Sequence, residues 1–138
     1  MTTYLTGSCL CGTVKYEIKG EAQRFYHCHC QRCRKATGTG HGSMILITPL
    51  TCISWLEGEM LLARYKVPEA ERFYNCFCSN CGSPMPRIVK ELDGVLIPAG
   101  SLDTDSPLEV QARIFYDSRA EWSCSDNIPC FAEYPPVE

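Results

Sequence analysis

CFCSNCG, residues 76–82, places three cysteines within seven positions. Its Cys78-x-x-Cys81 pair is followed by Gly82, which is typical of a tight turn that bends the chain around a metal, because glycine accepts a positive φ. In an extended segment, residues i and i+2 point to the same side, so a Cys-x-Cys pair aims two thiols at one point. This stretch therefore predicts one half of a thiolate metal site, and the fold has to bring the other half to it.

Two further cysteine clusters offer partners for it. Cys9 and Cys11 form a Cys-x-Cys pair near the N-terminus, and joining them to Cys78 and Cys81 would complete a site of four cysteines. A closed four-cysteine zinc site is structural and contributes directly to folding. We therefore expect a structural zinc that ties the N-terminal region to the middle of the chain.

The remaining cluster, Cys28-x-Cys30-x-x-Cys33, is a set of three thiols without an obvious fourth cysteine. Catalytic zinc sites keep one coordination position open, whereas structural sites are filled. From spacing alone both alternatives stay open, and the candidates for a closing ligand are His27, His29, His41 and Cys76. If the segment is extended, His29 points away from its cysteine neighbours.

An open site of three thiolates has a definite chemical bias. Three thiolates on a divalent zinc leave a net charge of about −1, so the metal is a weaker Lewis acid than one held by histidines. Exchange of a soft ligand such as a small thiol is favoured instead. The pattern points to carbon–sulfur chemistry, and His41, in a glycine-rich loop at 38–42, is a candidate acid or base.

Composition restricts the other classes of function. The chain has 138 residues, 45% hydrophobic and 21% charged, which predicts a single domain with its core at about 5–131. A net charge of −3 disfavours nucleic acid as the partner, and no apolar run approaches the length of a membrane helix. The first residues do not resemble a secretory signal, so we expect a cytoplasmic protein whose clustered cysteines bind metal.

Short alternating segments separated by Gly, Pro, Asn and Asp predict an all-β domain of packed sheets with short helical turns. One or two helical turns are expected at 31–37, and an irregular tail from Asn127. The lone cysteines, Cys52, Cys124 and Cys130, are expected to be buried apolar residues. Strands are expected at 13–19, 24–30, 43–48, 51–56, 60–66, 71–77, 87–89, 95–98 and 110–117.

The cysteine motifs with their flanking residues resemble the glutathione-dependent formaldehyde-activating enzyme family, which also includes centromere protein V. The resemblance is carried by GSCLCGTVKYE at 7–17, CHCQRCRK at 28–35 and FCSNCGSP at 77–84, with weaker matches in AGSLD at 99–103 and around Phe115, Trp122 and Pro129. It covers the chain from Gly7 to about Phe131.

The resemblance implies a tent-like, all-β zinc fold of packed antiparallel sheets with two zinc ions per chain. It assigns a structural zinc to Cys9, Cys11, Cys78 and Cys81, and an open catalytic zinc to Cys28, Cys30 and Cys33. The implied activity is that of a carbon–sulfur lyase, which joins formaldehyde to glutathione to give S-hydroxymethylglutathione.

Departures from the family pattern limit what the resemblance implies. Cys76 is an additional thiol just before the third motif. No short motif marks a pocket for glutathione, and Arg34 and Lys35 are candidates to bind its carboxylates. The substrate is thus glutathione or another small thiol adduct, and the alternative function is a non-catalytic two-zinc module that binds a protein partner.

Overall fold

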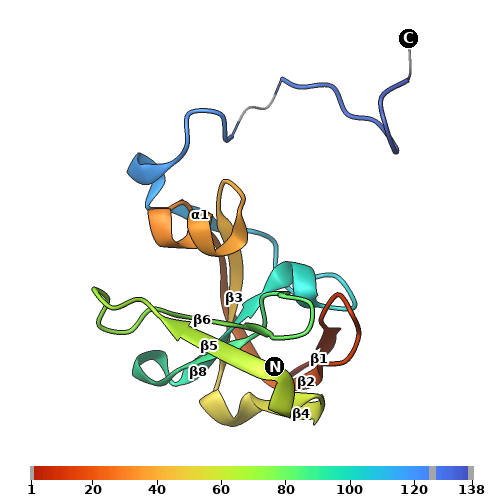
Figure 1. The fold of residues 1–138 in the computed structure, drawn as a ribbon, viewed down its shortest axis with the longest axis vertical. Helices are drawn as coiled ribbons and strands as arrows, with labels where there is room; N and C mark the ends of the chain where they lie inside the picture. The colour runs from red at the N-terminus through yellow and green to blue at the C-terminus, as the bar shows by residue number, and fades with distance from the viewer. Residues whose placement is uncertain (1, 125–126, 137–138) are drawn as a thin grey trace.

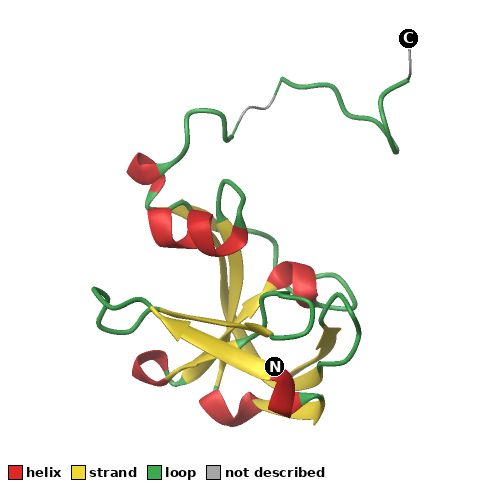
Figure 2. Cartoon of the chain, in the orientation of Figure 1, coloured by secondary structure: helices red, strands yellow, loops and turns green. Residues whose placement is uncertain are grey.

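The computed structural model describes residues 2–124 and 127–136, and most of its regular secondary structure consists of strands (Figures 1 and 2). The strands are β1 (Thr3–Ser8), β2 (Lys15–Cys28), β3 (Gly42–Thr48), β4 (Ile53–Glu57), β5 (Leu62–Lys66), β6 (Tyr74–Cys78), β7 (Arg87–Val89), β8 (Gly94–Pro98) and β9 (Ala112–Ile114). The helices are α1 (Gln31–Thr37) and the 3-10 turns η1 (Leu50–Cys52), η2 (Glu59–Leu61), η3 (Lys90–Leu92), η4 (Ala99–Ser101) and η5 (Tyr116–Ser118). The predicted all-β class with short helical turns is confirmed.

Strand β2 organises the larger sheet, because its two halves pair with different neighbours. Its first half pairs with β1 and β4, and its second half with β3 and β9. A register shift lies between Ala22 and Arg24. The sequence analysis predicted two strands here and was wrong, since this irregularity is absorbed within one continuous strand.

The core lies against one face of this sheet. Ile45 and Ile47 of β3 pair directly with Ile97 and Val95 of β8, and all four side chains are fully buried. Burial of such side chains stabilises the folded state by roughly 1.5–3 kcal/mol each. Val14, Tyr16 and Ile18, the apolar positions of the first alternating segment, are fully buried as well.

Strands β5 and β6 form a separate two-stranded sheet that carries the third cysteine cluster. Leu62 pairs with Cys78, and Lys66 pairs with Tyr74 at the other end. Phe77 also bridges to Pro84, so the chain turns back on itself directly after β6. This hairpin presents the turn at 78–82 to the N-terminal loop that follows β1.

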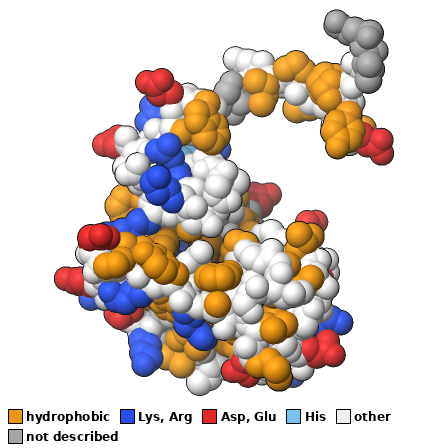
Figure 3. Space-filling view, in the orientation of Figure 1, with side chains coloured by type: hydrophobic (Ala, Val, Ile, Leu, Met, Phe, Trp, Pro, Cys, Tyr) orange, Lys and Arg blue, Asp and Glu red, His pale blue; other side chains and the backbone are white. Residues whose placement is uncertain are grey.

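Helix α1 follows β2 after two residues and confirms the helical turns expected at 31–37. Gly38 ends the helix with a φ of 73°, a left-handed conformation that glycine adopts without steric cost. The helix places Cys33 on its buried side, and Figure 3 shows Lys and Arg side chains gathered on its outer surface.

The strand expected at 110–117 is shorter than predicted and covers only β9, which pairs with β2 in parallel. Strand β1 was not predicted at all. Residues 127–136 contain no helix or strand, as expected for the tail, and this segment extends away from the rest of the chain (Figure 1).

Candidate metal centres

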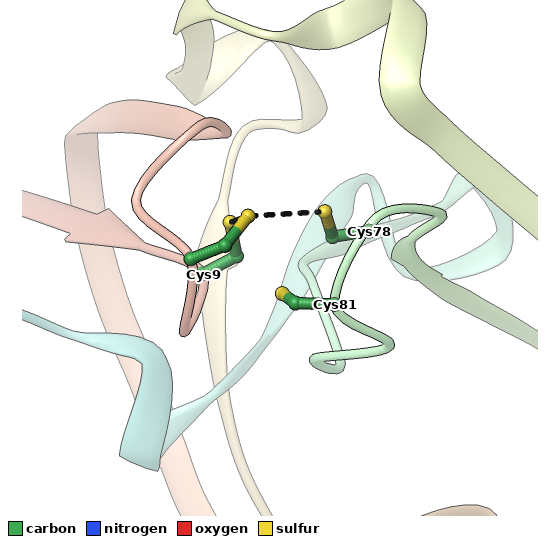
Figure 4. Close-up of side chains that lie close together, drawn as sticks. Cys9, Cys78 and Cys81 are labelled. Carbon is green, nitrogen blue, oxygen red and sulfur yellow. Dashed lines mark hydrogen bonds between the residues drawn. The ribbon is translucent and has the colours of Figure 1, made fainter.

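Four cysteines from two distant parts of the chain converge at the first candidate centre. The Sγ atoms of Cys9, Cys11, Cys78 and Cys81 all lie within 4.8 Å of one another. Cys9 and Cys11 are 3.5 Å apart, and Cys11 and Cys78 are 3.9 Å apart. Figure 4 shows Cys9 on the N-terminal loop facing Cys78 and Cys81 across the space between the two loops.

These distances fit a tetrahedral zinc site. A zinc–sulfur distance of about 2.3 Å places the sulfurs of a regular tetrahedron about 3.8 Å apart. The four thiols therefore offer the number, chemistry and spacing that a closed site requires.

Matching turns hold the two pairs of thiols in place. Gly12 and Gly82 both have a φ of 79°, and their backbone N–H groups donate to the carbonyl oxygens of Cys9 and Cys78, respectively. The two loops are also tied to each other, because the N–H of Leu10 donates to Ser83 Oγ at 2.9 Å. Backbone hydrogen bonds within and between the two loops thus hold the four thiols in this arrangement.

Polar neighbours favour the thiolate form at this centre. Hydrogen bonds with Ser83 lower the pKa of Cys81 to about 5. Hydrogen bonds with Thr13, and then with Asn80, lower the pKa of Cys11 to about 7. Burial acts in the opposite direction on Cys78 and raises its pKa to about 11. Two of the four thiols are therefore prepared to bind a cation near neutral pH.

The second candidate centre lies where β2 ends and α1 begins. The Sγ atoms of Cys28, Cys30 and Cys33 lie within 4.8 Å of one another. Cys30 is the N-cap of the helix, and its Sγ accepts a hydrogen bond from the N–H of Cys33 at 3.3 Å. A hydrogen bond from Cys33 lowers the pKa of Cys28 to about 6, and the same bond raises the pKa of Cys33.

The three thiols fit three corners of a tetrahedron, and no fourth ligand from the described residues joins them. No His, Cys, Asp or Glu in residues 2–124 or 127–136 completes this group to four. Cys76 is buried in the core and belongs to neither centre. The second group thus differs from the first in having one coordination position without a protein ligand.

The three histidines lie together on the other side of β2. The rings of His27 and His41 stack at 3.9 Å, and Ser43 Oγ lies 3.0 and 3.1 Å from their Nδ1 atoms. His29 is fully buried, with its Nε2 3.0 Å from the Arg113 guanidinium. Burial, followed by the neighbouring cationic groups, lowers the pKa of His27 to about 4. Neighbouring side chains of an extended segment point to opposite sides, so His27 and His29 point away from Cys28 and Cys30.

A cavity of about 490 Å³ opens beside the three-cysteine group and includes all three cysteines in its wall. Three arginines, Arg24, Arg32 and Arg87, and one glutamine, Gln31, also line it. Its apolar wall consists of Tyr26, Met44, Phe73, Leu96, Ile114 and Phe115. The cavity gives a small molecule access to the thiols from one side.

The other predicted site residues lie outside this cavity. His41 belongs to the histidine group, the guanidinium of Arg34 donates to the carbonyl oxygen of Ser118, and Lys35 is exposed on α1. The sequence analysis did not predict Arg87 of β7 as a residue of this cavity, because only the tertiary structure brings β7 near the three cysteines. The residues just before it, Pro84 to Pro86, form no motif that marks a binding residue.

The expectation for the lone cysteines was right for one residue and wrong for two. Cys52 is buried, as predicted. Cys124 is half-buried, with its Sγ 3.3 Å from Arg113, and Cys130 is exposed. Both lie beyond the last strand, where the chain leaves the core, so neither position offers an apolar environment.

The fold and the two thiol groups define a small β-protein with two candidate metal centres, and comparison with known proteins gives its family. Residues 4–118 match the family described as glutathione-dependent formaldehyde-activating enzyme. The match covers most of the chain, and the chain belongs to this family.

Further comparisons add fold information alone. A search of curated proteins found no match. Among solved structures, the chain is similar to a crystal structure of a Rhodobacter sphaeroides protein, with 20% identity, a TM-score of 0.60, and coverage of 79% of this chain and 99% of the other. No helix within the described residues is long and apolar enough to span a bilayer.

Proposed function

We propose that this chain is a zinc-dependent enzyme of carbon–sulfur chemistry that acts on the adduct of formaldehyde with glutathione or another small thiol. The observation that carries the proposal is the second group of cysteines, in which three thiols converge on the wall of a cavity and no fourth ligand comes from residues 2–124 or 127–136. Family membership supports the same reaction, since the family is described by glutathione and formaldehyde.

The reaction is a simple addition and its reverse. The thiol sulfur forms a bond to the carbonyl carbon of formaldehyde, the carbon–oxygen double bond becomes single, and the thiol proton ends on the oxygen as a hydroxyl. Zinc, when bound, supplies a Lewis acid with one exchangeable position that suits a soft sulfur ligand.

The residues of the chain contribute position and environment. Cys28, Cys30 and Cys33 fix the centre at the junction of a strand and a helix, which is a rigid support. In this proposal the cavity receives the thiol adduct next to these cysteines, which belong to its wall. Holding two reactants in a productive geometry provides a large part of the acceleration in such bimolecular reactions.

The other centre has a separate role in this proposal. Cys9, Cys11, Cys78 and Cys81 form a complete ligand set, so a metal there has no position left for a substrate. It ties the loop after β1 to the turn after β6. We assign it a purely structural function.

The test is a turnover assay on the zinc-loaded full-length protein. Formaldehyde is mixed with glutathione and with other small thiols, and formation of the S-hydroxymethyl adduct is followed by NMR against the uncatalysed rate. We expect acceleration by the wild type with at least one thiol, and none by Cys30→Ser.

Equal rates with and without the protein, for every thiol in the series, would overturn the enzymatic function. Two bound zincs together with that result would support the alternative, a non-catalytic two-zinc module. The Cys130→Ser variant is the matched control, because Cys130 is exposed and outside both thiol groups.

A further inference from the structure

The cavity beside the three cysteines combines an apolar wall with cationic side chains. Six apolar or aromatic side chains line it, together with Arg24, Arg32 and Arg87. No Asp or Glu from the described residues lies in its wall. Ligand pockets of this kind take an apolar body and use a few polar groups to fix its orientation.

Arg87 is held within this wall by a hydrogen bond and an aromatic ring. Its Nη1 donates to the carbonyl oxygen of Tyr74 at 2.7 Å, and its guanidinium lies 4.4 Å from the centre of the Phe73 ring. Its Nε is buried and has no hydrogen-bond partner among the described residues. A buried guanidinium with an unused N–H costs free energy, which an anion paired with the cationic group would offset.

Arg87 has no carboxylate partner among the described residues, since none of the ion pairs there involves it. A carboxylate is one of the anionic groups whose geometry a planar guanidinium matches with two parallel hydrogen bonds.

Apart from its three arginines, the same wall offers few hydrogen-bond partners for the amide groups of a peptide. Gln31 and the hydroxyl of Tyr26 are its uncharged polar side chains apart from the thiols. Glutathione is a tripeptide with two amide groups, and placing such groups against apolar side chains without partners costs free energy. A thiol with fewer polar groups would avoid this cost.

We propose that the preferred ligand of this cavity is a small thiol, or its hydroxymethyl adduct, with an apolar body and one carboxylate, and that Arg87 binds the carboxylate. This inference rests on the proposed function and narrows its substrate class. The thiol reaches the three-cysteine group, the apolar body packs against side chains such as Phe73 and Leu96, and the carboxylate pairs with the guanidinium of Arg87 in the cavity wall.

The experiment is isothermal titration of the zinc-loaded full-length protein with five probes. The central probe is 2-mercapto-3-phenylpropanoate. Its methyl ester and 2-phenylethanethiol lack the charge, mercaptoacetate lacks the apolar ring, and glutathione is the peptide thiol. We expect the central probe to bind about ten-fold more tightly than the methyl ester and 2-phenylethanethiol, since a hydrogen bond to a charged group contributes about that factor. We expect a similar factor, about ten-fold, over mercaptoacetate, which buries no ring, and over glutathione, whose amide groups meet apolar side chains.

Variants test the role of Arg87 separately. Arg87→Met should weaken the central probe about ten-fold and change the affinity for 2-phenylethanethiol by less than about two-fold, whereas Arg87→Lys should retain part of the preference. Arg72→Met is the matched control, because Arg72 is exposed, pairs with Glu91 and does not line this cavity. The comparison of the acid with its methyl ester requires only wild-type protein, so it tests whether the cavity prefers a carboxylate even if Arg87→Met fails to fold.

The two proposals fail in different ways. The inferred ligand class is wrong if glutathione binds as tightly as the central probe, or if the methyl ester binds as tightly as the acid. The proposed function would still hold in that case, provided that the protein turns over a glutathione adduct. If no thiol binds and none is turned over, both are wrong.

Discussion

The two cysteine groups use the same ligand atom in opposite ways. The first joins Cys9 and Cys11 to Cys78 and Cys81. Even the nearest two of these in sequence across the two pairs, Cys11 and Cys78, are 67 positions apart. The second, 28–33, is a single local run at the start of a helix. The first group is complete and surrounded by small polar side chains, and the second is incomplete and opens into a cavity.

In the proposed function, this difference teaches how one type of residue can serve both folding and chemistry. A metal that closes a long loop contributes to stability, because it holds together segments that the unfolded chain keeps apart. A metal held by one short run closes almost no loop, so its removal should change the fold little. Each of the following predictions tests this contrast.

The largest effect is expected for Cys78→Ser. Removing one of four ligands should abolish zinc binding at the first centre. Structural zinc contributes about 10–16 kcal/mol in small zinc peptides, which is comparable to the whole stability of a domain, about 5–15 kcal/mol. We expect a largely unfolded protein by circular dichroism and a loss of at least one zinc per chain. A native melting curve for this variant would contradict the structural role.

Cys30→Ser should have a much smaller effect on stability. Serine is a preferred N-cap residue, so the hydrogen bond from the N–H of Cys33 to position 30 can be retained. We expect a cost of about 1–2 kcal/mol, one zinc fewer per chain, and native circular dichroism. If this variant unfolds as fully as Cys78→Ser, the two centres do not divide their roles.

Acidification should release the two zincs in separate steps. As pH falls, protons compete for the thiolates, and a thiol with a low pKa keeps its charge longest. At the first centre Ser83 holds the pKa of Cys81 near 5, below its ordinary 9.0, so the stability from this thiolate persists above 9.0 and is lost as pH falls towards 5. Each centre has one thiol with a raised pKa, Cys78 at the first and Cys33 at the second. The first centre has two thiols with a lowered pKa, Cys81 and Cys11, whereas the pKa is lowered only for Cys28 at the second.

We therefore expect the second centre to release zinc first, as followed with a colorimetric chelator from about pH 8 to 4. Cys30→Ser should remove the step at higher pH and leave the other. A variant that instead loses the step at lower pH would reverse the assignment.

The smallest effect concerns the turn of the first centre. Gly82 has a φ of 79° and space for a methyl group, so Gly82→Ala should cost only the backbone strain of about 1–2 kcal/mol. We expect the melting temperature to fall by several degrees. Gly100→Ala is the control, because Gly100 also has open space but no positive φ. Equal melting temperatures for the two variants would show that the turn does not depend on its left-handed residue.

Much of the fold was predictable because its signals are local. The alternation at 13–19, the helical turns at 31–37 and the β7 strand at 87–89 depend on neighbouring residues, and the structure has elements there. The continuity of β2 and the parallel pairing of β9 were not predictable, since both depend on partners far away in the chain. Strand β1 was missed for the same reason, because its pairing with β2 specifies it more than its own pattern does.

The sequence alone determined the chemistry of the two centres. Thiol spacing at 9–11, 28–33 and 78–81 specifies soft metal ligands, and residues i and i+2 of a strand converge wherever the strand lies. Only the tertiary structure decided what surrounds them: that Cys76 belongs to neither group, that all three histidines lie on the far side of β2, and that Arg87 enters the wall beside the open thiols. Ligand identity follows from side-chain chemistry, whereas access to a site follows from packing between segments distant in sequence.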